Sequence, residues 1–429
     1  MTTALTPYQE TVRGLSDRLV EAQRPIRVLD SIKWDAGVRE RFFQRGCKEL
    51  PDVDRAYYEA RPLPFDADAK RREFQELERD IQQKLGNYNP LGVIMRRMCR
   101  EYDSVVQMLE ARGLPEFSRL SQRLYGSAHD AFHAGDPSLA DLGTMMSEAL
   151  TNIGRNSQGH EEEKDLSGEA VVAILQERLS AVFPDPQRPV RVMLSDGIIS
   201  DAAAGTDYIK IRGEARFSER DVRLMEIHEG WVHVATTMNG MNQPVCTFLS
   251  KGPPSSTVTQ EGLAILMEVM AFASYPSRVQ RLTNRIRAVA MAQEGATFLD
   301  LFRFLREEGL ADDECYANAA RVFRGSTSTE GPFTKDIAYS KGFVLIYNYI
   351  LLAVRKGLLA RIPLLFCGKT TLEDLRTLAQ LVEEGVVEPP KYLPPLFADL
   401  SSVTAWMCYS NFLSRLSPKR IEADYANLF

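Results

Sequence analysis

The stretch that decides the fold reads Leu224-Met225-Glu226-Ile227-His228-Glu229-Gly230-Trp231-Val232-His233. It holds two of the five histidines of the chain, five positions apart, and a glutamate follows the first of them directly. The usual hydrolytic zinc helix carries H-E-x-x-H, in which two histidines four positions apart share one helix face. The stretch here reads H-E-x-x-x-H, so one extra residue separates the two imidazoles.

The extra residue has a definite geometric consequence. Each residue of a regular α-helix turns about 100°, so a side chain at i+5 points roughly 140° away from the side chain at i. A π-type turn absorbs one residue and brings the two positions back to the same side of the helix. Gly230 lies between the histidines and tolerates such a distortion. The spacing alone leaves two possibilities open. Either His228 and His233 are ordinary residues of a regular helix and point apart, or a one-residue bulge near Gly230 and Trp231 lets both bind one metal ion.

A catalytic metal site of this kind has three protein ligands and keeps one position for water. With His228 and His233 as two ligands, Glu261 is the candidate for the third, and we expect it in the first turn of the next helix. Glu229 is expected to hold the water and take its proton. Two histidines and one carboxylate are also the ligand set of non-haem iron oxygenases, so this chemistry stays an alternative. A regulatory protein that keeps the metal for structure is a second alternative.

The composition excludes several classes of protein. The chain has 429 residues, of which 44% are hydrophobic and 26% charged, so it can bury a large core. The net charge of -6 argues against a nucleic-acid partner, because no basic excess neutralises phosphates. The most apolar run, from Gly342 to Val354, is too short to span a bilayer and predicts a core helix rather than a membrane anchor. The oligomeric state is not determined by these features.

Cysteine usage and the N-terminus indicate a cytoplasmic protein. The six cysteines are scattered without a C-x-x-C pair, which is typical of reduced thiols and not of a disulfide framework. Residues 1–7 lack the basic and apolar regions of a secretory signal.

The periodicity of apolar residues predicts two regions. Residues 1–160 form a helical N-terminal region that ends in a polar, charged stretch at residues 154–165. Residues 161–429 begin with a helix capped by Ser167 and continue with short β-branched or aromatic runs. We expect two or three strands of a small sheet there, at residues 190–194, 198–199 and 208–211. The expected fold class is α+β and predominantly helical.

Two capping boxes mark helix starts after the sheet. Ser218 with Asp221 predicts the start of the helix that carries His228. Thr257 with Gln260 predicts the start of a helix over residues 261–274. His129 and His133 have the i, i+4 spacing of a metal pair, but we interpret them as a solvated or partly packed helix face.

A second motif lies downstream of the histidines and reads Gln260-Glu261-Gly262-Leu263-Ala264. It resembles the motif of the QEGLA family, known in bacteria as flavohaemoglobin expression-modulating proteins. The vertebrate microtubule-associated tyrosine carboxypeptidases belong to the same wider family. Residues 331–342, with Arg324-Gly325 upstream, also look like the family. The resemblance covers most of the chain through three motifs in the same order.

The resemblance implies a zinc-dependent metallopeptidase with one Zn²⁺ per chain. It implies a zincin-like, gluzincin-type core in residues 161–429, with the small sheet next to the metal-binding helix and a helical C-terminal elaboration. His228 and His233 match the ligand histidines of the family, Glu261 the third ligand and Glu229 the catalytic glutamate. With this match, we predict that the helix carries the one-residue bulge near Gly230 and Trp231.

The characterised relatives remove a C-terminal tyrosine from α-tubulin. The resemblance therefore implies a carboxypeptidase that acts on the C-terminal tail of a peptide or protein, with tyrosine or another aromatic residue at the end. This chain shows no long basic extension for gripping a microtubule, so the tubulin substrate does not transfer directly.

Residues around the ligands are candidates for handling the substrate. A carboxypeptidase holds a terminal carboxylate with a guanidinium or an ammonium, and Arg324 and Lys335 are the candidates in the family-like loop. Tyr339 is expected to donate a hydrogen bond to the oxyanion that develops at the attacked carbonyl. Glu268, seven residues after Glu261, is expected to orient a metal ligand or to pair with an arginine. A basic helix follows with Arg278, Arg281, Arg285 and Arg287. We expect these residues to form a solvated helix face, and attraction of an acidic peptide tail is the alternative.

Overall fold

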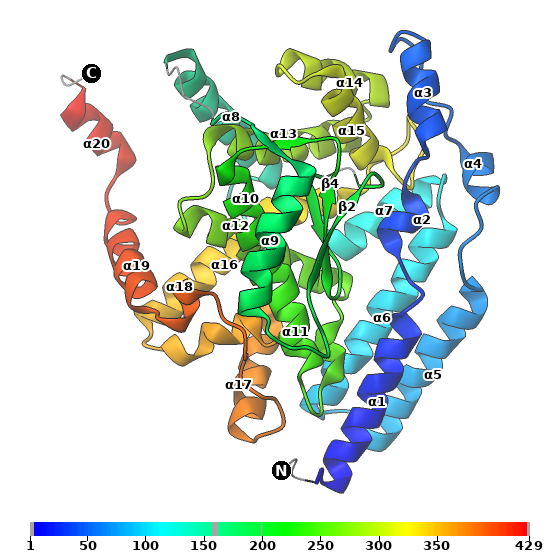
Figure 1. The fold of residues 1–429 in the computed structure, drawn as a ribbon, viewed down its shortest axis with the longest axis vertical. Helices are drawn as coiled ribbons and strands as arrows, with labels where there is room; N and C mark the ends of the chain where they lie inside the picture. The colour runs from blue at the N-terminus through cyan, green and yellow to red at the C-terminus, as the bar shows by residue number, and fades with distance from the viewer. Residues whose placement is uncertain (1–3, 157–161, 199, 427–429) are drawn as a thin grey trace.

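A computed structural model describes residues 4–156, 162–198 and 200–426. Helices make up 64% of it and the sheets are small, which confirms the predominantly helical α+β class (Figure 1). The predicted boundary near residue 160 stays a prediction, and residues 157–161 of the expected polar stretch lie outside the described residues.

The N-terminal region is a layer of helices, as the apolar spacing predicts. Figure 1 shows α1, α5 and α6 running side by side, and Asn89 caps the first turn of α6 by accepting from the Gly92 amide. The helices of this layer are α1 (Pro7–Gln23), α2 (Val28–Ile32), α3 (Ala36–Gln44), α4 (Arg55–Glu59), α5 (Ala67–Leu85), α6 (Pro90–Glu110), α7 (Pro115–Tyr125) and α8 (Leu139–Asn156). His129 and His133 lie exposed in the connection between α7 and α8, so the prediction of a helix face at these residues is wrong.

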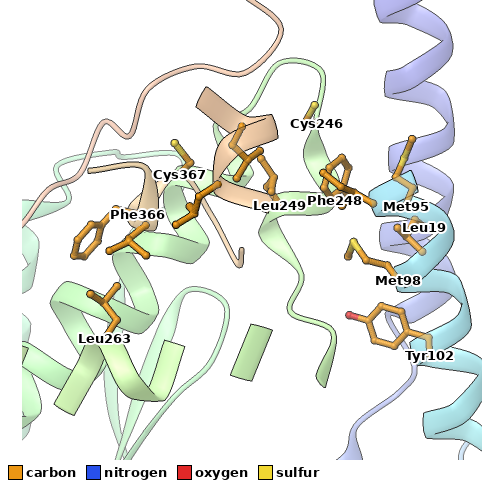
Figure 2. Close-up of a cluster of buried hydrophobic side chains, with 14 of the residues drawn as sticks. Leu19, Met95, Met98, Tyr102, Cys246, Phe248, Leu249, Leu263, Phe366 and Cys367 are labelled. Carbon is orange, nitrogen blue, oxygen red and sulfur yellow. The ribbon is translucent and has the colours of Figure 1, made fainter. Parts of the chain in front are cut away.

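One apolar core joins this layer to the later part of the chain. Figure 2 shows Met95 and Met98 of α6 facing Phe248 and Leu249, with Phe366 and Cys367 beyond them. All of these side chains are buried. Segments that are far apart in the sequence therefore share one packed interior.

The small sheet forms where the period of the sequence changes from helical to alternating. Its strands are β2 (Arg191–Ser195), β3 (Ala202–Ala204) and β4 (Tyr208–Arg212), in the order β2-β4-β3. β2 and β4 are parallel, and β3 is antiparallel to β4. The strand predicted at residues 198–199 is wrong at Ile198, and Ile199 lies outside the described residues. The short side chains of Ala202–Ala204 gave no β-branched signal, so sequence reasoning missed β3.

The metal-helix candidate begins where the first capping box predicts. The Ser218 side chain accepts from the Asp221 amide, and the Asp221 carboxylate accepts from the Ser218 amide. One helical rod then runs through α10 (Glu219–Met225), the π-helix η1 (Glu226–Val234) and α11 (Ala235–Met241). The helix α9 (Gly168–Val182), capped by Ser167 as predicted, packs with β1 (Leu166–Ser167), β5 (Arg216–Phe217) and the sheet beside this rod.

The second capping box was wrong. The helix α12 (Pro254–Met270) begins before the predicted range of residues 261–274, with Pro254 at its first position. Proline fixes the backbone angle that a first turn needs and lacks only an amide that would be unpaired there, so it starts the helix in place of Thr257. Glu261 consequently lies two turns inside α12 and not in its first turn.

The helices α12 and α16 (Ala338–Arg355) cross at two glycines. A Cβ on Gly262 would lie 2.1 Å from the carbonyl carbon of Gly342, and a Cβ on Gly342 would lie 2.0 Å from the carbonyl oxygen of Val258. Only hydrogen fits at such distances, so the glycine of the QEGLA motif sets how closely the two helices approach. Thr334–Arg355 is long and apolar enough to cross a membrane, but α16 packs along α12 as a core helix does.

The remaining helices surround this centre, with the C-terminal ones along the left side of Figure 1. They are η2 (Thr247–Ser250), α13 (Pro276–Gln293), α14 (Phe298–Glu307), α15 (Asp312–Phe323), η3 (Thr334–Ile337), η4 (Leu359–Arg361), η5 (Pro363–Phe366), η6 (Leu372–Asp374), α17 (Leu375–Glu383), α18 (Pro395–Ala398), α19 (Ser401–Leu413) and α20 (Pro418–Tyr425). Of these, α13, α15 and η3 contribute side chains to the centre of the molecule.

The crossing gives a first testable prediction. Gly262→Ala should destabilise the protein by about 2–4 kcal/mol, because the added methyl group forces the two backbones apart. Urea unfolding followed by circular dichroism measures this. Gly14→Ala is the matched control, since a Cβ on Gly14 in α1 would meet nothing within 4 Å. It should be neutral or stabilising, because alanine is the better helix former. Equal stability of the two variants would contradict the prediction.

Candidate metal centre

The two histidines of the opening stretch face the same point. Residues Glu226–Val234 form a π-helix, which confirms the bulge predicted around Gly230 and Trp231. The ring centroids of His228 and His233 are consequently 4.9 Å apart. Packing also favours glycine at position 230, because a Cβ there would lie 2.7 Å from Cδ2 of Leu179 in α9. The π-turn therefore aligns the imidazoles, and the missing side chain of Gly230 lets α9 pack against the rod.

Glu261 completes a group of three. Its Oε2 lies 3.5 Å from Nε2 of His228 and 3.4 Å from Nε2 of His233. One ligand atom from each of these residues falls within 4.8 Å of the others, in a group that can hold a metal ion. The helix α12 packs directly against η1, and this contact brings Glu261 to the histidines.

The chemistry of this group fits a metal ion. Glu261 Oε2 is buried and finds no hydrogen-bond partner among the described residues, although buried carboxylate oxygens are normally paired. It faces two ring nitrogens that are lone-pair donors when the imidazoles are neutral. A cation placed among the three would satisfy the oxygen and both nitrogens at once.

A buried carboxylate orients the first histidine. Nδ1 of His228 donates to Oε1 of Glu268 at 2.6 Å, which leaves the lone pair of Nε2 available to a metal ion. Arg278 of α13 donates two hydrogen bonds to the same carboxylate, through Nη2 at 2.8 Å and Nε at 3.1 Å. Both roles considered for Glu268 from the sequence therefore occur together. Arg278 lies inside this network, so the expectation of a solvated basic face was wrong for it.

The charges of these groups shift their pKa values. Burial disfavours the imidazolium, but the Glu261 and Glu268 carboxylates raise the pKa of His228 to about 10. Burial likewise opposes the ionised carboxyl of Glu268, yet Arg278 and His228 lower its pKa to about 2. The pKa of Glu261 is held well below its usual range by Lys335 and the two histidines, against the effect of burial. All three shifts reflect close pairing of opposite charges.

Lys335 lies in the centre, as predicted, but not as a free cation. Its Nζ donates to Oε1 of Glu261 at 2.9 Å. A second lysine approaches from the C-terminal part of the chain, where Lys369 donates to the carbonyl of His233 at 3.0 Å and to Oε1 of Gln260 at 2.8 Å. Gln260 also accepts from Thr236, so the first residue of the QEGLA motif ties α12 to the metal helix.

Glu229 contacts the sheet. Its Oε2 accepts from the Ala204 amide of β3 at 2.8 Å. β3 is an edge strand of the sheet, and this bond fixes the carboxylate between the edge and the histidines. The predicted placement of the sheet next to the metal helix is therefore correct.

Tyr339 lies between the histidines and a group of arginines. Its ring stacks on His228 with centroids 6.3 Å apart, and its hydroxyl oxygen accepts from Nη2 of Arg321 at 3.3 Å. Arg321 also forms a buried ion pair with Asp336. Arg324 follows at the end of α15, buried, with its guanidinium over the ring of Phe333.

This geometry agrees with a comparison to known families. A family model described as microtubule-associated tyrosine carboxypeptidase matches residues 40–415. The chain belongs to that family. Membership implies a carboxypeptidase-type enzyme with a protein or peptide substrate. A search of curated proteins finds no match. The matched range, residues 40–415, includes every candidate site residue described above.

The sequence did not reveal that several charged residues lie buried or half-buried around the three candidate ligands. They are Arg278, Arg285, Arg321, Asp336 and Lys369. Arginines and lysines are common on solvated helix faces, so nothing in their local pattern marks these as buried. A signal was present only for Asp336, which lies in the family-like segment 331–342.

The carboxylate behind His228 gives a second prediction. Glu268→Gln should weaken binding of a divalent transition metal about 10- to 100-fold, because it removes the charge that supports the imidazole and leaves Arg278 unpaired. Titration with Co²⁺, followed by its visible absorption, measures this. The control is Glu226→Gln in η1, because the Glu226 carboxylate pairs with Arg178 at 2.8 Å near the surface. Unchanged affinity in Glu268→Gln would show that the carboxylate does not support the metal site.

Proposed function

We propose that this chain is a zinc-dependent carboxypeptidase that removes the C-terminal residue of a peptide or protein, with one Zn²⁺ held by His228, His233 and Glu261. The observation that carries the proposal is the arrangement of these three ligands around the unpaired Glu261 oxygen. Ligand atoms at ~2.0–2.1 Å from a tetrahedral zinc lie ~3.3 Å from one another. The separations of 3.5 Å and 3.4 Å between Glu261 Oε2 and the two Nε2 atoms are close to that value.

When bound, zinc polarises a substrate carbonyl and lowers the pKa of water at the site. The residues of the chain would do the rest. Glu229 lies next to His228 in sequence and is held by Ala204, so its carboxylate can take a proton from the attacking water. The same carboxyl then gives this proton to the leaving amine as the C–N bond breaks. Glu229 therefore acts first as general base and then as general acid.

Tyr339 is suited to stabilise the oxyanion. A guanidinium only donates hydrogen bonds, so the bond from Arg321 occupies the Tyr339 oxygen and leaves the phenolic proton free. A free donor beside the His228 ring can reach the oxygen of the attacked carbonyl, where negative charge develops.

Arg324 is the better of the two predicted groups for the substrate carboxylate. Lys335 already pairs with Glu261, whereas Arg324 has no carboxylate partner among the described residues. A guanidinium binds a carboxylate through two parallel hydrogen bonds. We therefore assign the terminal carboxylate of the substrate to Arg324, and assign to Lys335 the neutralisation of Glu261.

The alternatives make different predictions about the metal and about Glu229. An iron oxygenase would carry iron and needs no base beside the first histidine. A regulatory protein would hold zinc and cleave nothing. A carboxylate directly after the first histidine, held in place by the Ala204 amide, supports hydrolysis, because an oxygenase needs no base at that position.

A third prediction tests the base. Glu229→Gln should keep about one zinc per chain but lose hydrolysis about 10²- to 10⁴-fold, because the amide cannot accept the proton. Metal analysis and digestion of a proteome-derived peptide library, read by mass spectrometry, report both quantities. Glu226→Gln, three residues earlier in η1, is the matched control and should cleave like the wild type. Full activity in Glu229→Gln would remove this residue from the mechanism.

A fourth prediction concerns protons and metal removal. A chelator should abolish hydrolysis, and zinc should restore it.

His228 ligates only when neutral, and its pKa of about 10 without metal means that zinc displaces a proton. Affinity should therefore fall about tenfold per pH unit over roughly pH 8 to pH 6. In the metal-free protein the same raised pKa stabilises the fold below the ordinary imidazole pKa of ~6.5, and this stability is lost as the pH rises towards about 10. Calorimetric zinc titration at several pH values checks the affinity, and a pH-independent affinity would contradict it.

A further inference from the structure

Two guanidinium groups near the metal centre lack a counter-ion. Neither Arg285 of α13 nor Arg324 of α15 has a side-chain hydrogen bond or an ion pair within the part of the chain that the structure describes. The Nε atom of each is buried and unpaired. Guanidinium groups lose hydration when buried, so such groups are normally paired with carboxylates.

The neighbouring cations, in contrast, each have a partner. Arg278 pairs with Glu268, Arg321 with Asp336, and Lys335 with Glu261. This cluster thus holds five cationic side chains and three carboxylates, and the difference of two corresponds to Arg285 and Arg324. A metal ion would add further positive charge.

The two unpaired guanidinium groups share the same surroundings. The Arg285 guanidinium lies 5.1 Å from the ring centroid of Tyr339, and the charges of Arg321, Asp336 and Tyr339 act on both Arg285 and Arg324. Burial and the charge of Arg321 lower the pKa of each to about 10, so both stay charged at neutral pH. Arg285 keeps partial exposure, whereas Arg324 is buried.

We propose that Arg285 and Arg324 bind two carboxylates of one C-terminal residue, so that the enzyme prefers substrates ending in glutamate or aspartate. Arg324 takes the α-carboxylate and Arg285 takes the side-chain carboxylate. The inference rests on the proposed carboxypeptidase function and adds the identity of the residue removed. This end residue differs from the aromatic one that the resemblance implied, and the test below compares the two directly.

The physical reason is charge compensation. A substrate ending in tyrosine brings one carboxylate, which leaves one guanidinium uncompensated in a buried, cationic environment. A terminal glutamate or aspartate brings two. On a peptide the closest pair of carboxylates is that of a terminal acidic residue, which suits two guanidinium groups that share their neighbours. Binding of the second carboxylate is a charge-assisted interaction and should discriminate strongly against the isosteric amide.

The test uses the zinc-loaded full chain and three peptides that differ only in the last residue, which is Glu, Gln or Tyr. The wild type should show a kcat/KM for the Glu peptide about 10- to 100-fold above that for the Gln peptide, and above that for the Tyr peptide. In Arg285→Met the Glu-to-Gln ratio should fall to about one, and in Arg285→Lys it should be intermediate. The ratio is measured within each variant, so incomplete folding does not affect it.

A matched control lies two residues further on the same helix. Arg287 pairs with Glu308 at 2.7 Å, so Arg287→Met should keep the wild-type ratio. A wild type that cleaves the Gln or Tyr peptide as well as the Glu peptide would overturn this inference and leave the proposed function intact. An unchanged ratio in Arg285→Met would also overturn it, even if all rates fell, because Arg285 would then not read the side chain. No cleavage of any peptide would overturn the proposed function itself.

Discussion

The arrangement of the centre depends on one backbone feature, the π-turn in Glu226–Val234. In a regular helix the i+5 spacing would direct His228 and His233 to different sides. The wider turn brings both imidazoles to Glu261 and leaves Glu229 facing the edge of the small sheet. A π-turn is less favourable than an α-turn, so it persists only where the surroundings hold it. Here α9 packs on Gly230 and Lys369 binds the His233 carbonyl.

A second constraint is the close contact between α12 and α16. Gly262 and Gly342 bring these backbones together at the level of Glu261. The two helices also carry the residues on either side of His228, since Glu268 lies on α12 and Tyr339 on α16. The glycine of the QEGLA motif is therefore a packing residue. Beside it, Gln260 accepts from Thr236 of the helix that carries the histidines, and Glu261 completes the group that could hold a metal ion.

Buried charge is the third feature of the centre, and it is arranged in pairs. Glu268 is shared by His228 and Arg278, and Glu261 by Lys335 and the two histidines. Such pairs offset the loss of hydration that burial imposes on each ion. Among the residues that the structure describes, Glu261 Oε2 and the guanidinium groups of Arg285 and Arg324 have no partner. We propose that a cation and anions from outside the chain bind there.

The sequence by itself determined the local features, because short-range patterns encode them. The H-E-x-x-x-H spacing predicted the π-turn once it was combined with the downstream motifs. Ser218 predicted the start of the metal helix, and apolar periodicity predicted the helical N-terminal region. Local patterns gave a wrong helix start where two start signals lay close together. The capping box at Thr257 predicted a later start for α12, but the helix begins at Pro254.

Only the tertiary structure decided which distant charges meet. Arg278 and Arg321 read as ordinary surface residues in the sequence, yet they neutralise Glu268 and Asp336 inside the protein. Their roles depend on how α13 and α15 pack around η1 and α12, and packing depends on the shape of whole helices and not on neighbouring residues. For the same reason the unpaired state of Arg285 could not be read from the chain, because the absence of a partner is a property of the whole fold.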